Sequence, residues 1–192
     1  MRLAIALVIA TAIVTATVLV ASRDDEQTTD LGAATLVGDS MNVGTDPYLR
    51  EALSGWRIDA HDRVGRTTAE GVEQLRALGG AVAPVVVVSL GTNDADGSED
   101  EFRALVGDVL RLAGPGRCVV WATIVRGGEP REGFNDVLEE AAAANRQLRL
   151  LDWAMLVEHD ESLLAGDLVH GTPDGYVRRA EETARIARTC PG

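Results

Sequence analysis

Short apolar runs alternate with longer amphipathic stretches along most of the chain. The runs rich in Val, Ile and Leu, which predict strands, are residues 33–37, 85–90, 118–124 and 148–152, and a weaker strand is predicted at 57–60. Apolar residues follow one another in these runs instead of alternating with polar ones, which indicates that both faces of each strand are buried. Buried strands separated by helical stretches predict a parallel sheet with helices on both sides.

Capping residues mark the beginnings of the helices. Ser98 with Glu101, and Thr67 with Glu70, each form a capping box ahead of an apolar run of helical period that ends in glycine. Two further helices are predicted by the apolar positions within residues 134–141 and by Thr172 with Pro173, a cap followed by the residue that best suits a first turn. The pattern therefore predicts an α/β domain.

The first 21 residues have a different character. Residues 3–21 carry no charge and follow a single basic residue, Arg2. Their length is near the roughly 20 residues that span a membrane, so we expect an uncleaved signal anchor, with cleavage after Ala21 as the alternative. In either case the rest of the chain is extracytoplasmic. We expect residues 22–31 to be a linker and residues 32–192 to be one monomeric domain.

The charge of the chain limits its partners. The formal net charge is −12, and no cluster of basic residues offsets it. Nucleic acid and anionic lipid head groups repel such a surface, so we expect neither as a partner, and contact with the membrane through the N-terminal segment alone. A neutral small molecule or carbohydrate is the better substrate.

Two cysteines, Cys118 and Cys190, are present in the chain. An exported pair can oxidise to a disulfide, which would close a long loop. The alternative is two separate thiols, with Cys118 buried in a strand and Cys190 near the frayed carboxyl terminus. The residues alone leave both possibilities open.

Polar segments that can carry chemistry follow the predicted strands. They are Gly38-Asp39-Ser40, the segment 91–94 and the segment 167–170. Ligands of open parallel sheets bind at the carboxyl ends of the strands, so these segments are expected to meet there. A serine hydroxyl needs a base to become a nucleophile, and a histidine held by a carboxylate is the usual base. Ser40, His170 and Asp167 form such a set, since the spacing of Asp167 and His170 lets the carboxylate reach one ring nitrogen.

Acyl transfer also needs hydrogen-bond donors for the oxyanion that develops in the transition state. The candidate donors are the backbone N–H of Ser40 at a strand-to-helix turn, the N–H of Gly65 in a loop after a strand, and the side-chain amide of Asn93. Gly71 is a weaker candidate for the role of Gly65.

These segments resemble the motif blocks of the SGNH (GDSL-like) hydrolases in type and order. The matching residues are Val37-Gly38-Asp39-Ser40, Gly65 in Val64-Gly65-Arg66, Gly91-Thr92-Asn93-Asp94 and Asp167-Leu168-Val169-His170. The resemblance covers residues 33–188 and implies a flavodoxin-like three-layer α/β/α sandwich with a five-stranded parallel sheet. It also implies a catalytic triad of Ser40, Asp167 and His170, with Ser40, Gly65 and Asn93 forming the oxyanion hole. Met41 stands where many members have Leu, which we expect to alter packing more than chemistry.

Other residues have simpler interpretations. His61 and His159 are competing bases, but each lies in a polar, acidic segment typical of solvated loops. Neither has metal-ligand spacing with a second His, and the acidic residues at 94, 96, 99 and 100 do not fit the spacing of an EF-hand calcium loop. No metal or organic cofactor is therefore expected. Trp56, Trp121 and Trp153 are interpreted as core or pocket lining.

The sequence thus favours a serine esterase of the SGNH type. Its expected substrates are O-acetyl or other short acyl esters of a cell-envelope carbohydrate, or a small ester. Two alternatives remain: acyl transfer to an envelope sugar, and a membrane-tethered binding module of the same fold that lacks catalysis.

Overall fold

A computed structural model describes residues 31–95 and 97–191. Five strands form one parallel sheet in the order β2-β1-β3-β4-β7. Their bounds are β1 Gly32–Gly38, β2 Trp56–Ala60, β3 Val85–Ser89, β4 Cys118–Ala122 and β7 Leu148–Leu151. All five predicted strands are confirmed, with ends that differ by at most two residues. The predicted membrane segment, 1–21, and residues 22–30 of the predicted linker lie outside the described residues. Within the described ranges, no helix combines the length and the apolar character needed to cross a membrane.

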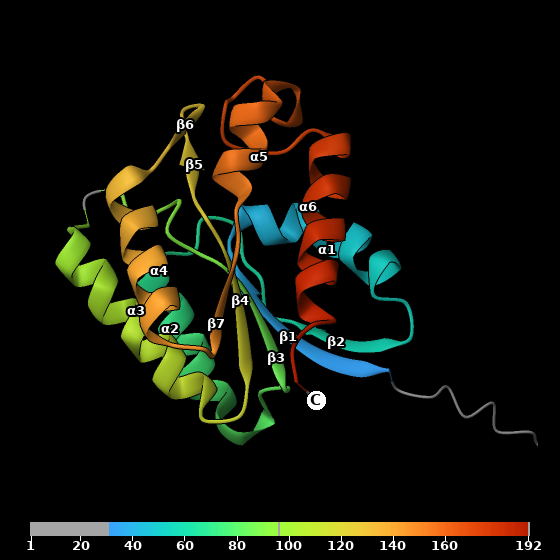
Figure 1. Ribbon diagram of the computed structural model, residues 1–192, viewed down its shortest axis with the longest axis vertical. Coiled ribbons are helices and arrows are strands. Elements are labelled where there is room, and N and C mark those ends of the chain that lie inside the picture. Colours follow the sequence, from blue (N-terminus) through green and yellow to red (C-terminus); the bar gives the residue numbers. More distant parts are fainter. Residues whose placement is uncertain (1–30, 96, 192) are drawn as a thin grey trace, which may run out of the picture.

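Helices cover both faces of this sheet (Figure 1). They are α1 Ser40–Ala52, α2 Thr68–Leu78, α3 Glu99–Ala113, α4 Glu132–Ala144, α5 Trp153–His159 and α6 Pro173–Ala187, with short 3-10 turns at Gly79–Ala81 and Glu161–Leu163. α1, α5 and α6 share one apolar cluster with the sheet, and α2, α3 and α4 share the other. The expected three-layer α/β/α arrangement is therefore confirmed.

The central strand β3 shows why most of the predicted runs are continuously apolar. The prediction that both faces are buried was wrong for the edge strand β2, whose residues alternate between partly buried and exposed. Val85 and Val87 point into the cluster beneath α1 and α6, whereas Val86 and Val88 point into the cluster beneath α2, α3 and α4. All four are at most 4% exposed. Because burying an aliphatic side chain is worth about 1.5 to 3 kcal/mol, a polar residue at any of these positions would destabilise one of the two cores.

Local capping places the helix ends where the sequence predicts them. Thr67 and Ser98 each accept a backbone hydrogen bond in a reciprocal capping box, and Thr172 caps α6 with Pro173 in its first turn. Gly79 and Gly114 end α2 and α3 with positive φ angles of 51° and 84°. These interactions satisfy backbone groups that have no partner inside the helix.

A hairpin after β4 and the short helix α5 were among the elements that were not predicted. The chain after β4 folds into a small antiparallel hairpin, β5 Val125–Arg126 and β6 Glu129–Pro130. Gly127 and Gly128 connect its strands with φ angles of 68° and 82°. A Gly-Gly pair is suited to a two-residue hairpin turn, which requires positive φ at both positions, so this pair was the signal for the hairpin. The helix α5 was not predicted because it is short and its sequence shows no clear helical period of apolar residues.

The two cysteines form a disulfide between β4 and the residues that follow α6. Cys118 and Cys190 are bonded across a sequence separation of 72 residues. Cys118 is 3% exposed, in the apolar cluster under α6. The structure therefore decides between the two possibilities that the sequence left open, and the bond ties the residues that follow α6 to the first residue of β4.

Candidate active site

The turn between β1 and α1 places Ser40 at the carboxyl edge of the sheet. β1 lies between β2 and β3, at the point where the order of strands along the chain reverses, which is the usual position of ligand sites in such sheets. Asp39 caps α1 by accepting a hydrogen bond from the N–H of Met41 at 2.9 Å. Ser40 is the first residue of α1, where backbone N–H groups have no acceptor within the helix.

The structure brings Ser40, His170 and Asp167 into one line of hydrogen bonds. Nε2 of His170 lies 2.8 Å from Oγ of Ser40, and Nδ1 of His170 lies 2.6 Å from Oδ2 of Asp167. An imidazole with its proton on Nδ1 satisfies both contacts, because Nδ1 then donates to the carboxylate and Nε2 accepts from the hydroxyl. The side chains of His170 and Asp167 are 39% and 53% exposed, so substrate can reach this line from solvent.

A tight turn holds Asp167 in this position. One carboxylate oxygen of Asp167 accepts hydrogen bonds from the backbone N–H of Val169 at 3.0 Å and of His170 at 2.9 Å. Leu168 adopts a φ of 57°, which a leucine rarely does, and its carbonyl accepts from the N–H of Gly128 in the hairpin. The His170 side chain, followed by these two N–H groups, lowers the pKa of Asp167 to about 2.

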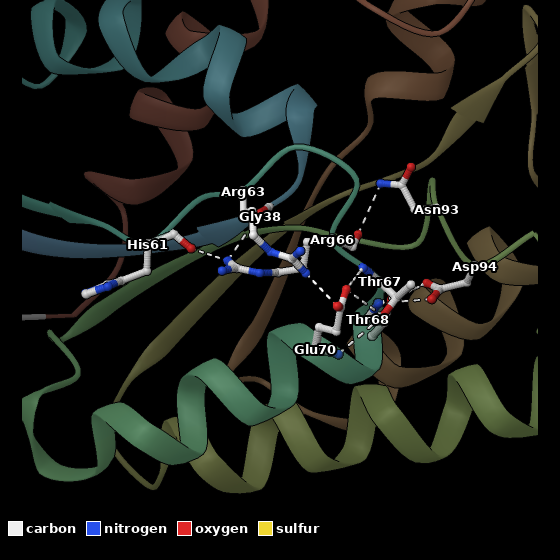
Figure 2. A network of polar contacts seen from close by, with 9 residues as sticks. All are labelled: Gly38, His61, Arg63, Arg66, Thr67, Thr68, Glu70, Asn93 and Asp94. Atoms are coloured by element: carbon white, nitrogen blue, oxygen red, sulfur yellow. Dashed lines mark hydrogen bonds and ion pairs between the residues drawn. The ribbon is translucent and has the colours of Figure 1, made fainter.

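The loop after β2 lies against the turn that carries Ser40. Gly38 accepts hydrogen bonds through its carbonyl from the N–H of Arg63 at 3.0 Å and from Nη1 of Arg66 at 3.3 Å. The same nitrogen of Arg66 also donates to the carbonyl of His61, and Figure 2 shows how this arginine crosses the loop. Gly65 is an exposed residue of this loop with a φ of 74°, and its N–H has no partner among the described residues. Gly65 therefore keeps the free donor that the sequence analysis assigned to it.

Gly71, the weaker alternative, is not a free donor. It lies inside α2, where its N–H donates to the carbonyl of Thr67 at 3.0 Å. A side chain at this position would collide with Leu90, whose nearest atom would be 2.3 Å from the added Cβ. Gly71 is therefore a packing residue, and this alternative for Gly65 was wrong.

Asn93 follows β3 and connects the two neighbouring loops. Its Nδ2 donates to the carbonyl of Arg66 at 3.1 Å (Figure 2) and to Oδ2 of Asp39 at 3.3 Å. The next residue, Asp94, accepts from the backbone N–H of Thr68 at 3.0 Å and so stabilises the start of α2. Asp94 thus has a structural partner, and Asn93 is oriented by two acceptors, one of which belongs to Asp39, the residue before Ser40.

Two carboxyl groups beside α1, the buried Asp39 and the partly buried Asp62, have raised pKa values. Burial raises the pKa of Asp39, which the Met41 N–H and then the charge of Arg179 partly oppose. Burial also raises the pKa of Asp62 to about 6, against a hydrogen bond at 3.2 Å from the amide of Asn42. No motif marks Asp62 or Arg179, because their importance depends on what packs around them.

The competing bases lie away from this line of contacts. Nε2 of His61 pairs with Asp59 at 2.9 Å, and Nδ1 of His159, the last residue of α5, pairs with the carbonyl of Met155 at 2.8 Å. Within residues 31–95 and 97–191, no group of three or more His, Cys, Asp or Glu is arranged to hold a metal ion.

Met41 and two of the three tryptophans belong to the core. Met41 is 4% exposed in the apolar cluster beneath α6, so it contributes packing rather than a surface of the site. Trp121 and Trp153 are at most 1% exposed, and Trp56 is partly buried against the same cluster as Met41.

A hollow of about 560 Å³ opens beside Asn93. Apolar side chains of α3 and α4 form much of its wall, among them Phe102, Leu105 and Phe134, and its acidic residues are Asp94, Glu101 and Asp108. This volume lies within the usual range for small-molecule sites. The hollow therefore offers space for a neutral, partly apolar group next to Asn93, one of the three candidate oxyanion donors.

No protein-family model matches the chain, and no curated protein matches it in sequence. Solved structures do match its fold. The catalytic domain of peptidoglycan O-acetyltransferase A from Streptococcus pneumoniae is 20% identical, with a TM-score of 0.64 over 83% of this chain and 92% of that one. A family 3 carbohydrate esterase from Clostridium thermocellum is 16% identical, with a TM-score of 0.65 over 84% and 99%. A lipolytic protein of the G-D-S-L family from Veillonella parvula is 18% identical, with a TM-score of 0.63 over 80% and 96%.

These similarities extend over most of both chains in each pair. They confirm, at the level of the fold, the resemblance to the SGNH hydrolases that the motifs indicated.

Proposed function

We propose that this chain, which has the fold of the G-D-S-L hydrolases, is a serine esterase with Ser40 as its nucleophile. The observation that carries the proposal is the contact of 2.8 Å between Nε2 of His170 and Oγ of Ser40, together with the contact of 2.6 Å between Nδ1 and Asp167. A hydroxyl, an imidazole and a carboxylate in this order form the arrangement that activates serine for attack on an ester.

The reaction proceeds in two steps. Oγ of Ser40 attacks the ester carbonyl while Nε2 of His170 takes its proton, and Asp167 stabilises the imidazolium that forms. The alcohol leaves with that proton, and water then hydrolyses the acyl-enzyme by the same route. Oxyanion donors are the N–H groups of Ser40 and Gly65 and the amide of Asn93. The Asn93 amide already donates to two acceptors, Oδ2 of Asp39 and the carbonyl of Arg66. In the proposed reaction the oxyanion therefore shares one of the amide hydrogens with one of these two acceptors.

Short acyl esters are the proposed substrates, and an extracytoplasmic carbohydrate is the proposed carrier. The hollow beside Asn93 supports a neutral group, since three acidic residues line it. The net charge of −12 also disfavours an anionic substrate. We expect the hydrolysis of p-nitrophenyl acetate to exceed that of the p-nitrophenyl monoester of succinate, which carries a carboxylate. A preference for the anionic ester would contradict this substrate class.

Acyl transfer to a sugar hydroxyl is the second candidate. It is favoured by the similarity in fold to the O-acetyltransferase domain from Streptococcus pneumoniae. In this reaction a sugar hydroxyl replaces water in the second step. Measuring free acetate and acetylated oligosaccharide in the same incubation separates the two reactions, because each acyl-enzyme yields one product or the other.

A serine-directed fluorophosphonate probe tests the proposal directly. Labelling requires an activated hydroxyl and a formed oxyanion site, so we expect wild-type protein to be labelled and Ser40→Ala to be unlabelled and inactive. Ser162→Ala, which changes a serine near the surface away from the triad, is the matched control and should be labelled normally. Folded wild-type protein that resists the probe would favour the non-catalytic binding module.

A further inference from the structure

A buried arginine lies beneath the turn that carries Ser40. Arg179, on α6, is 3% exposed, and its Nη2 donates to Oγ of Ser89 at 2.8 Å. Its guanidinium carbon lies 5.1 Å from the centre of the Trp153 ring. Burial lowers the pKa of Arg179 to about 10. Removing a cation from water costs free energy unless a negative charge nearby balances it.

Arg179 interacts electrostatically with Asp39, which is itself fully buried, and with Tyr176. Ser89 connects Arg179 to Asp39, because its hydroxyl accepts from Arg179 and its carbonyl accepts from the N–H of Asp39 at 3.0 Å. Asp39 in turn accepts from the N–H of Met41 and from the amide of Asn93. The charge of Arg179 thus acts on the one carboxylate that contacts both the first turn of α1 and a candidate oxyanion donor.

The contacts of Arg179 are poorly suited to stabilising the fold. Its Nη1 is buried and has no hydrogen-bond partner within the part of the chain that the structure describes. A buried polar group without a partner costs about 1 to 3 kcal/mol, and apolar residues often replace buried charges without loss of stability. An electrostatic effect on the site explains this buried charge better than a contribution to folding does.

We propose that Arg179 is a positioning residue of the esterase site, whose positive charge keeps Asp39 as a carboxylate and thereby holds the Asn93 amide beside Ser40. This proposal rests on the proposed function. A carboxylate accepts hydrogen bonds through both oxygens, whereas a protonated carboxyl uses one oxygen as a donor. Without Arg179 the buried Asp39 takes up a proton, and its contact with the Asn93 amide is lost.

Other charged and titratable groups also act on Asp39 and Arg179. Arg66 and Asp62, from the loop after β2, interact electrostatically with Asp39, and Tyr176 on α6 interacts with both. All three remain unchanged in the variants below. Replacing Arg179 also removes a charge that lowers the pKa of Tyr176, so a change in pH dependence is assigned to Asp39 only if it disappears in the Asp39→Asn background.

The test combines activity and pH in a double-mutant cycle. Fluorophosphonate labelling and turnover of p-nitrophenyl acetate by wild-type protein are established first, and failure there refutes the proposed function rather than this role of Arg179. The kcat and KM are then measured from pH 5.5 to 9 for Arg179→Met, Asp39→Asn and the double variant. Arg185→Met is the control, since Arg185 lies on the same helix, is 67% exposed and pairs with Glu182.

Arg179→Met is expected to lower kcat by about 100-fold at pH 6.5, as loss of an oxyanion donor does, with KM changed less than threefold. Activity should recover as the pH rises, because Asp39 then ionises without help. In the Asp39→Asn background the same replacement should add less than a threefold loss, because two residues that act through one group are not additive. Wild-type kcat in Arg179→Met, a loss that is equal at every pH, or additive losses in the double variant would overturn the proposal.

Arg179→Lys and Arg179→Gln keep the proposal testable if the methionine variant does not fold. The lysine variant retains the charge and should keep at least a third of the wild-type kcat, whereas the glutamine variant should lose activity at pH 6.5 and regain it at pH 9. Equal activity in the two variants would show that the charge is irrelevant and would refute the role of Arg179.

Discussion

Nε2 of His170 lies 2.8 Å from Oγ of Ser40, although 130 positions separate the two residues in the chain. The contact depends on the packing of two helices, because Ser40 begins α1, α6 begins shortly after His170, and these helices lie against each other. Asp167 completes the line from the other side of the imidazole. The predictions that follow concern the parts of the structure that maintain this geometry.

Replacing Asp167 by Asn should remove most of the activity. The amide cannot stabilise the imidazolium and favours the wrong histidine tautomer, so we expect kcat for p-nitrophenyl acetate to fall at least 100-fold, with little change in thermal stability. Glu158→Gln, a neutralisation on the exposed surface of α5, serves as the control. Activity within threefold of wild type would exclude Asp167 from the triad.

The acid limb of the pH–rate profile should not arise from Asp167. Its pKa of about 2 lies below the ordinary value of 3.8 for an aspartate, so its favourable interaction with His170 is fully present above pH 3.8 and is lost as the pH falls towards 2. Asp167 therefore stays ionised throughout an assay from pH 4 to 9. An inflection of kcat/KM near pH 4 that disappears in Asp167→Asn would contradict this assignment.

Arg66→Met should impair turnover more than folding. The guanidinium of Arg66 joins the loop that carries Gly65 to the carbonyl of Gly38, so its loss frees a candidate oxyanion donor to move. We expect a decrease in kcat of roughly tenfold, since misplacing a donor costs part of what its removal costs. The matched control is Arg63→Met, because the Arg63 side chain pairs with Glu70 at the surface of the same loop. Equal effects of the two replacements would argue against a specific role for Arg66.

Asp62→Asn should stabilise the protein at neutral pH. Because the pKa of Asp62 is raised from 3.8 to about 6, the folded state binds its proton more tightly than the unfolded state does. The contribution of Asp62 to stability is thus complete below pH 3.8 and is lost as the pH rises through 6. Asparagine does not ionise and so avoids this loss of stability. Urea titrations should therefore show a free energy of unfolding that is higher than that of wild type by roughly 1 to 3 kcal/mol at pH 7.5. The gain should vanish near pH 4, and a destabilised variant at pH 7.5 would contradict the prediction.

Breaking the disulfide should lower stability without abolishing the site. Cys190→Ser removes the bond while leaving Cys118 in β4, and a closed loop of this size is worth about 4 kcal/mol in the chain-entropy model. We expect Tm to fall by roughly 10 °C. A reductant should lower the Tm of wild-type protein to that of the variant and leave the variant itself unchanged. If reduction lowers the Tm of both equally, the loss does not come from this bond.

The sequence by itself determined the local architecture and the order of the motifs. Strands β3 and β4 are apolar and buried along almost their whole length, and Thr67, Ser98 and Thr172 cap the helices that they precede. Both signals act over a few residues, and so they can be read along the chain without knowledge of the fold.

The tertiary structure decided which distant residues meet. The order of the strands places the turns after β1 and β3 side by side, the packing of α6 on α1 brings His170 to Ser40, and Cys118 is joined to Cys190. The roles of Arg179 and Asp62 depend on the same packing, because desolvation and the charges around a side chain arise only when segments far apart in the sequence enclose it.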